Sequence, residues 1–89
     1  PHEPKGCYAT CNLHSAKNGI YKGISFAPEL EQYIYRKCIY KKEGDKIEFF
    51  DNAAKCLGII FMKFPDEKQM FDIMNRIDEL VYIDFLEKN

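Results

Sequence analysis

The run Cys-Leu-Gly-Ile-Ile-Phe-Met at residues 56–62 limits what this chain can fold into more than any other stretch. It has the length of a β-strand, it contains no charged or hydrogen-bonding polar side chain, and it is rich in β-branched and aromatic residues. This composition is typical of a central strand that is buried on both faces, so we expect the rest of the chain to be arranged around it. Gly58, inside the run, indicates a bulge or a close approach by a helix backbone.

A long helix is predicted directly after this strand. Pro65 suits the first turn of a helix, and Asp66 with Gln69 three residues later fits a capping box. Apolar residues then recur at helical spacing: Met70, Ile73, Met74, Ile77, Leu80 and Val81. One buried strand that leads into one amphipathic helix is therefore the expected nucleus of the fold.

Upstream of this nucleus, residues 7–14 alternate between apolar and polar side chains, which predicts a half-buried strand. The polar loop over 15–19 ends in Asn-Gly, a strong hairpin signal, and we expect 20–25 to return antiparallel to the first strand. The remaining expected elements are a short helix over 27–33, strands over 34–42 and 46–50 joined by a turn at 43–45, a connection over 51–55, and a short edge strand over 81–85.

This order of elements predicts a single α+β domain over residues 1–89. Strands that follow one another through short turns favour a mainly antiparallel sheet, here of about five to six strands, with one short and one long helix packed on one face. The chain has 89 residues, of which 46% are hydrophobic and 15% aromatic, and this is enough apolar surface for one core.

Charge and hydropathy argue against nucleic-acid and membrane partners. The formal net charge is -1, the isoelectric point is about 6.1, and no basic cluster exceeds Lys41-Lys42, whereas a phosphate-binding surface needs many clustered cations. No apolar run approaches the roughly 18 residues of a membrane-spanning helix, and no signal peptide opens the chain. We therefore expect a cytoplasmic protein. Because the chain begins at Pro1 rather than Met, we also expect it to be processed or excised from a longer protein.

The four cysteines, Cys7, Cys11, Cys38 and Cys56, are expected to be reduced thiols. On a strand, Cys7 and Cys11 would be roughly 13 Å apart, and a disulfide needs Cα atoms within about 7 Å of each other. Cys38 and Cys56 fall in apolar runs, where a free cysteine packs as a small hydrophobe. Four reduced thiols agree with a cytoplasmic location.

Two combinations of residues have side chains suited to metal binding or nucleophilic catalysis, but neither has the spacing of a known motif of that kind. Cys7, Cys11 and His14, with His2, are suitable zinc ligands, yet they do not form a zinc knuckle, and on a strand His14 faces away from Cys11. Cys11 with His14 or His2 as its base would make a nucleophilic pair, but burial of an inward cysteine raises its thiol pKa. The acidic residues fall on turns and helix starts, so no catalytic residue is predicted.

Three segments taken together resemble a known module. They are Gly19-Ile20-Tyr21-Lys22-Gly23-Ile24 before a proline-started helix, Lys42-Glu43-Gly44-Asp45-Lys46-Ile47 in a strand turn, and Leu57-Gly58-Ile59-Ile60 before the helix start Asp66-Glu67-Lys68-Gln69-Met70. The pattern is similar to the C-terminal domain of ATP-grasp carboxylate-amine ligases, the L-amino acid ligase and carbamoyl-phosphate-synthase-like group. The resemblance covers roughly residues 8–83.

The resemblance implies a non-catalytic accessory domain that packs on the ATP-grasp core of the same chain and helps to form a homodimer. In this family, ATP and magnesium are bound by the upstream core through a Glu-x-Asn-x-Arg run, which this chain lacks. The domain itself is therefore expected to bind no cofactor. The hairpin tip, Ser15, Lys17, Asn18 and Gly19, is the only part expected near the substrate, where Lys17 could approach an anionic group. Ordinary turn chemistry explains these four residues equally well.

Two other interpretations stay open. A free-standing α+β interaction or regulatory module would self-associate through an exposed strand such as residues 81–85. A small metal-binding domain would use Cys7, Cys11 and His14. The ligase interpretation predicts an exposed apolar docking patch and no ATP binding or hydrolysis by the chain alone, whereas the free-standing module predicts a patch-free surface or a closed homo-oligomer. The metal-binding interpretation predicts stoichiometric zinc in protein purified without a chelator.

Overall fold

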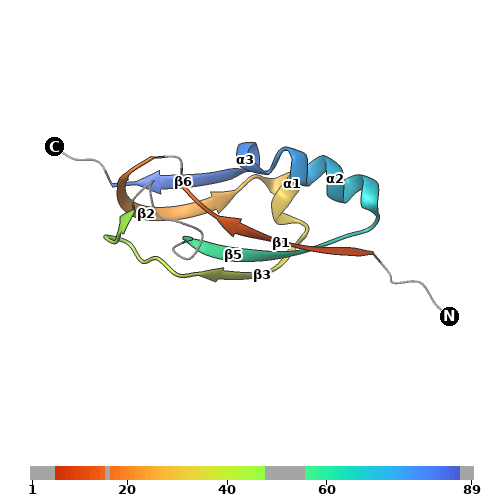
Figure 1. Cartoon of the computed structure of the whole chain (residues 1–89), viewed down its shortest axis with the longest axis horizontal. Coiled ribbons are helices and arrows are strands. Elements are labelled where there is room, and N and C mark those ends of the chain that lie inside the picture. The colour runs from red at the N-terminus through yellow and green to blue at the C-terminus, as the bar shows by residue number, and fades with distance from the viewer. Residues whose placement is uncertain (1–5, 16, 48–55, 87–89) are drawn as a thin grey trace.

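Six strands and three short helices make up the computed structural model, which describes residues 6–15, 17–47 and 56–86 (Figure 1). In chain order the elements are β1 (Cys7–Leu13), β2 (Gly19–Phe26), α1 (Pro28–Glu31), β3 (Ile34–Ile39), β4 (Lys46–Ile47), β5 (Gly58–Phe64), α2 (Glu67–Asn75), α3 (Ile77–Leu80) and β6 (Val81–Phe85). All strand pairs are antiparallel, which confirms the predicted α+β class. The strands form two three-stranded sheets instead of one.

Strand β5 lies at the centre of the first sheet, whose order is β1-β5-β3. Its central position was predicted, but burial on both faces was wrong. Ile60, Met62 and Phe64 are buried, whereas Ile59 and Phe61 on the opposite face are only partly buried. The helices and the second sheet cover one face of β5, and the hydrophobic run alone does not indicate that its other face meets solvent.

The second sheet has the order β4-β2-β6, so β1 and β2 do not form the predicted hairpin. Strand β1 pairs instead with β5, from Cys7 opposite Phe64 to Leu13 opposite Gly58. This pairing places the apolar side of β1 beside the apolar side of β5. Among the described glycines, only Gly6 and Gly44 have a positive φ, so Gly19 does not form the tight Asn-Gly turn and begins β2 instead.

The predicted hairpin between 34–42 and 46–50 is also wrong, because β3 pairs with β5 and β4 pairs with β2. The turn between them does form, and Gly44 supports it with a φ of 100°. Its backbone is tied to β2 by hydrogen bonds from Tyr21 N–H to the Asp45 carbonyl and from Gly44 N–H to the Tyr21 carbonyl, both 2.8 Å. The predicted strand end at 48–50 and the connection over 51–55 lie outside the described residues.

Two helices occupy the place of the predicted long one. Helix α2 begins as expected, because the Asp66 side chain accepts a 2.8 Å hydrogen bond from the backbone N–H of Gln69. The Gln69 side chain donates to the Tyr33 hydroxyl at 2.7 Å instead of completing the capping box. The helix ends at Asn75, and after a break at Arg76 helix α3 begins. The break redirects the chain so that β6 can pair with β2, and the Leu80 carbonyl accepts a hydrogen bond from Ala27 N–H.

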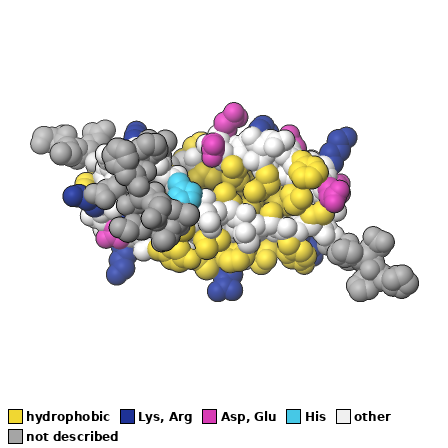
Figure 2. Space-filling view, in the orientation of Figure 1, with side chains coloured by type: hydrophobic (Ala, Val, Ile, Leu, Met, Phe, Trp, Pro, Cys, Tyr) yellow, Lys and Arg dark blue, Asp and Glu magenta, His cyan; other side chains and the backbone are white. Residues whose placement is uncertain are grey.

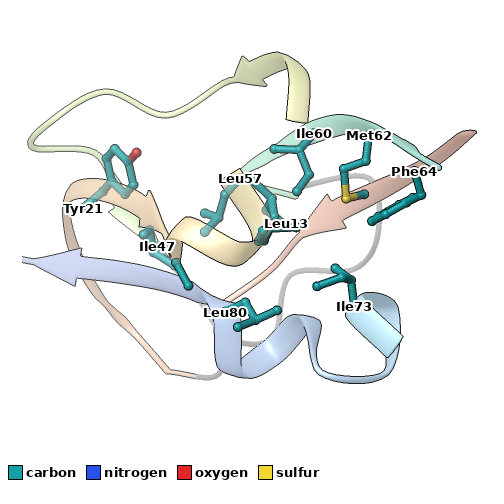
Figure 3. Packing of buried hydrophobic residues seen from close by; sticks show 11 residues of the cluster. Leu13, Tyr21, Ile47, Leu57, Ile60, Met62, Phe64, Ile73 and Leu80 are labelled. Carbon is teal, nitrogen blue, oxygen red and sulfur yellow. The ribbon is translucent and has the colours of Figure 1, made fainter. Parts of the chain in front are cut away.

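The core lies between the two sheets and beneath the helices. Figure 3 shows Phe64 of the first sheet and Ile73 of α2 pointing toward one another, with Leu80 beside them. The buried hydrophobic residues are Leu13, Tyr21, Ala27, Leu30, Ile47, Leu57, Ile60, Met62, Phe64, Ile73 and Leu80. The short proline-started helix and the C-terminal edge strand are both present, as the sequence predicts. No helix in the described ranges is long and apolar enough to cross a membrane.

Candidate functional site

The loop before β2 carries the residues that the sequence predicts near a substrate. Ser15 organises the described part of this loop, because its hydroxyl accepts a hydrogen bond from Lys17 N–H at 3.1 Å and donates one to the Lys17 carbonyl at 2.6 Å. Such a turn is the local chemistry that serine favours. Ser15 therefore shapes the loop, and Lys17 carries the charged group that remains exposed on it.

A pocket of about 460 Å³ lies beside this loop, and its described lining residues are Lys17, Asn18, Gly19, Ile20, Lys46, Ile47, Phe85 and Leu86. The Lys17 ammonium lies 5.0 Å from the centre of the Phe85 ring. Gly19 leaves room for this ring, because a Cβ at this position would lie 2.4 Å from Cδ1 of Phe85 and the ring would have to shift. The described lining carries two lysines and no carboxylate, so the pocket suits an anionic group with an apolar portion.

A neighbouring pocket of about 500 Å³ shares Lys17 and Phe85 and is lined further by His14, Ser15, Asp78, Val81 and Ile83. The four residues of the expected hairpin tip are thus distributed over two adjoining pockets, although the hairpin itself does not form. Asp78 also influences the nearby strand β1. Burial first, and the charge of Asp78 second, raise the pKa of the Cys11 thiol above its ordinary value of 9.0.

Sequence reasoning missed Lys46 and Phe85, which line the first pocket from strands other than β2. Lys46 reaches the pocket because β4 pairs with β2, which sets it opposite Ile20. Phe85 reaches it because β6 pairs with β2 on the other side. The alternating pattern of 81–85 places Phe85 on the inward side of its strand, but the sequence does not indicate which strand lies beside it.

The residues of the metal-binding alternative are spread along β1 and beyond its end. Cys7 lies opposite Phe64 at one end of the strand, and Cys11 lies opposite Ile60. His14 is exposed after the strand ends. Among the residues that the structure describes, no three His, Cys, Asp or Glu side chains come together in a group that could hold a metal ion. All four cysteines are free thiols in the structure.

The outer face of the first sheet, away from the helices, carries a second feature that the sequence did not suggest. Tyr8 of β1 and Tyr35 of β3 are 61% and 58% exposed. Their ring centres are 6.1 Å apart at an interplanar angle of 86°, and Tyr35 lies 6.3 Å from Phe61 of β5. We call these three residues the aromatic face. Figure 2 shows hydrophobic side chains exposed along β5 and β3 at the lower edge of the molecule.

The chain resembles solved structures in its fold, although neither comparison by sequence finds a relative. No family model matches the chain, and no curated protein matches it. Among solved structures, phosphoribosylglycinamide synthetase from Anaerococcus prevotii matches 89% of this chain with a TM-score of 0.66 and 24% identity. L-amino acid ligase from Bacillus licheniformis matches 94% of it with a TM-score of 0.75 and 15% identity. The chain spans about a fifth of the length of these two proteins, 20% and 21% respectively. At these identities the likeness shows a shared fold.

Proposed function

We propose that this chain is a non-catalytic accessory domain of an ATP-dependent carboxylate-amine ligase, of the ATP-grasp, carbamoyl-phosphate-synthase-like group. In this proposal it packs on the ATP-grasp core of the same polypeptide in the cytoplasm and contributes to dimer formation. The observation that carries the proposal is the shared fold: 89% and 94% of this chain match one part of two proteins, a synthetase and an amino acid ligase. The short segments that resemble the same family support it independently.

An accessory role agrees with how the polar side chains are used. The Ser15 hydroxyl bonds within its own loop, and Asp66 caps helix α2. Glu29 and Asp72 both bind the Arg76 guanidinium, at 2.6 Å and 2.9 Å. General acid or base catalysis needs titratable groups that converge in one pocket, whereas Glu29, Asp66 and Asp72 are held by structural contacts. The carboxylates that would hold magnesium and ATP then belong to the core.

A contribution to substrate binding is proposed for the loop residues Ser15, Lys17, Asn18 and Gly19. Lys17 is the group with the right charge, since an acyl-phosphate ligase handles a carboxylate and a phosphate. Lys46 lines the same pocket and doubles its positive charge. Both lysines would attract the anionic substrate electrostatically without taking part in bond formation.

The natural protein that contains this chain provides the test of function. We expect it to hydrolyse ATP only when a carboxylate and an amine are both supplied, with one ADP released for each bond formed. The 89-residue chain alone should neither bind nor hydrolyse ATP. ATP turnover by the chain alone, or a natural protein without ATP-dependent ligation, would contradict the proposal.

One observation favours a second candidate function, a free-standing interaction module. Strand β6 is an edge of the second sheet, and no strand in the described ranges pairs with its outer side, where another chain could pair with its backbone. If this function is correct, the chain alone forms a dimer, and Ile83→Pro abolishes it by removing a backbone donor. A monomeric chain at high concentration excludes this second candidate.

A further inference from the structure

We propose that the aromatic face docks an apolar protein surface that carries carboxylates. The aromatic face consists of Tyr8, Tyr35 and Phe61, one residue from each strand of the first sheet. Tyr8 and Tyr35 are exposed and Phe61 is partly buried, and their rings lie side by side over three adjacent strands. Exposed apolar patches of this kind mark interaction sites. Tyrosine in particular is enriched at the centre of protein interfaces, because it combines apolar area with a hydroxyl that can donate a hydrogen bond.

A local irregularity in β3 builds this surface. Ile34 lies opposite Met62 and Arg36 lies opposite the next residue, Phe61, so the register shifts by one residue at Tyr35. The extra residue is a β-bulge, which allows Tyr35 and Arg36 both to contact Phe61 although they are neighbours in sequence. A regular strand would have turned one of them to the opposite face. Bulges commonly re-aim side chains next to functional sites.

Two cationic side chains, those of Arg36 and Lys63, lie close to the rings of the aromatic face. The Arg36 guanidinium lies 5.7 Å from the centre of the Phe61 ring, and the Lys63 ammonium lies 5.5 Å from the centre of the Tyr8 ring. Neither forms an ion pair with any residue that the structure describes. Lys37, on the same strand as Arg36, differs because it binds Glu31 at 2.6 Å. Arg36 and Lys63 therefore keep their charge available for a partner.

The distribution of acidic residues makes the aromatic face and its surroundings positively charged. None of the residues in β1, β5 or β3 is acidic. The helices on the other side of the molecule carry the acids Glu29, Glu31, Glu67, Asp72, Asp78 and Glu79. Figure 2 shows acidic side chains on that helical side. Because the sheet face offers only positive charge, the complementary partner surface is negative.

Two other kinds of binding partner, a second copy of the chain and a nucleic acid, fit the aromatic face less well. A second copy docked face to face would set Arg36 and Lys63 against the same cations, and like charges in an interface are unfavourable. Single-stranded nucleic acid binds by stacking its bases on exposed ring faces. Here the cations already lie over the rings of Phe61 and Tyr8, and the chain has a net charge of -1. Carboxylates can approach these cations without displacing them from the rings.

The identity of the partner rests on the proposed function: the docked surface then belongs to the ATP-grasp core of the same polypeptide. The test uses the natural protein with p-benzoylphenylalanine in place of Tyr35, followed by irradiation and peptide mapping. The matched control carries the same photoprobe at Tyr82, a 48% exposed tyrosine of the other sheet. We expect the Tyr35 probe to link an apolar, Asp- or Glu-bearing protein segment with a yield about ten-fold above the control.

The charge of the surface is tested in the same experiment. R36E/K63E should lower the yield about ten-fold, and R36Q/K63Q should lower it less, whereas K42E/K68E, which changes exposed lysines outside the aromatic face, should leave it unchanged. Thermal unfolding of each variant checks that it folds. Links to a nucleic acid, to a second copy, or at the level of the Tyr82 control would overturn the docking proposal. Links to an acidic surface of a protein without ligase activity would support docking and contradict the proposed function.

Discussion

Gly58 lies where the backbones of β5 and β3 approach each other, and this contact explains why a glycine interrupts the most apolar run of the chain. A Cβ on Gly58 would lie 2.5 Å from the Cys38 carbonyl oxygen and 2.9 Å from the Ile39 Cα. Both atoms belong to the backbone, so no side-chain rotation relieves the clash. The sequence indicated a close approach at this position, but the neighbour is a strand and not a helix.

Gly58→Ala is therefore expected to lower the free energy of unfolding by about 2–3 kcal/mol, because the two strands must separate. Gly23→Ala is the matched control, since no atom lies within 4 Å of the position of its Cβ. That variant should change stability by less than about 1 kcal/mol, with stabilisation as the expected sign. Urea unfolding of both variants measures the difference, and equal effects would contradict the contact.

Cys11 should titrate above the ordinary thiol value of 9.0, because burial and then Asp78 raise its pKa. As pH rises, the unfolded chain loses this proton before the folded chain does. The contribution of Cys11 to stability is thus complete below about pH 9 and is lost as the pH rises through the folded-state pKa. Asp78→Asn should lower the Cys11 pKa and speed its alkylation. Peptide-resolved iodoacetamide rates against pH measure this, and a Cys11 pKa at or below 9.0 would be inconsistent with its burial.

Lys17 is expected to affect substrate binding and not bond formation. In the natural protein, Lys17→Ala should raise the KM for the carboxylate substrate about five-fold, which corresponds to about 1 kcal/mol, and leave kcat within about two-fold. Lys68→Ala on the exposed side of α2 is the control, with no expected effect on either constant. If Lys17→Ala leaves the KM unchanged, Lys17 does not contribute to substrate binding and the proposed role of the loop is contradicted.

At the level of elements, the start of α2 depends on one hydrogen bond. Asp66→Ala removes the acceptor for the Gln69 N–H and should lower the free energy of unfolding by about 1 kcal/mol. Asp66→Asn keeps an acceptor oxygen, so it should cost less than half as much. Chemical denaturation compares the two variants, and an equal loss in both would assign the effect to the charge of Asp66 at the helix N-terminus instead.

The elements that the sequence predicts are those with local signals. Alternation marks β1, Pro28 marks the start of α1, and Asp66 marks the start of α2, because each signal acts within a few residues. The partners of the strands depend on contacts far apart in the chain. The Asn-Gly and Glu-Gly-Asp segments are both typical of hairpins, yet each connects the two sheets, since β5 provides a better apolar partner for β1 and β3 than β2 or β4 does.

The helix break at Arg76 also arises from tertiary contacts. Its guanidinium joins Glu29 of α1 to Asp72 of α2, and the chain must turn after it to bring β6 beside β2. The periodic apolar residues continue across the break, so periodicity predicted one helix where there are two.

At the scale of the whole molecule, the candidate site was only partly predictable, because part of it depends on pairing between strands that are far apart in the chain. The loop over 15–19 was identified because its residues are contiguous in the sequence. Lys46, Phe85 and the aromatic face come from different strands, and only the register of the sheets brings them together. The alternation of residues 7–14 already sets Tyr8 on the polar side of its strand, whereas Phe61 falls in a run that was expected to be buried on both faces. Tyr8 and Tyr35 are exposed and Phe61 is only partly buried, because no described element covers the outer face of the first sheet.

The helices and the outer sheet face give the molecule two sides of different character. Acids gather on the helices, whereas aromatic rings and two cations that pair with no described acid gather on the sheet. An asymmetric surface of this kind suits a domain with one docked side and one solvated side. It agrees with an accessory domain that is held against a larger partner.

The size of the natural polypeptide tests the central claim most directly. An antibody raised against this domain, used on a lysate of the source cells, shows whether the domain belongs to a longer chain. We predict a single band far above 10.5 kDa, because the two solved proteins with this fold devote only 20% and 21% of their length to it. A band at 10.5 kDa would contradict the proposal of a ligase domain and leave a free-standing interaction module as the function to test.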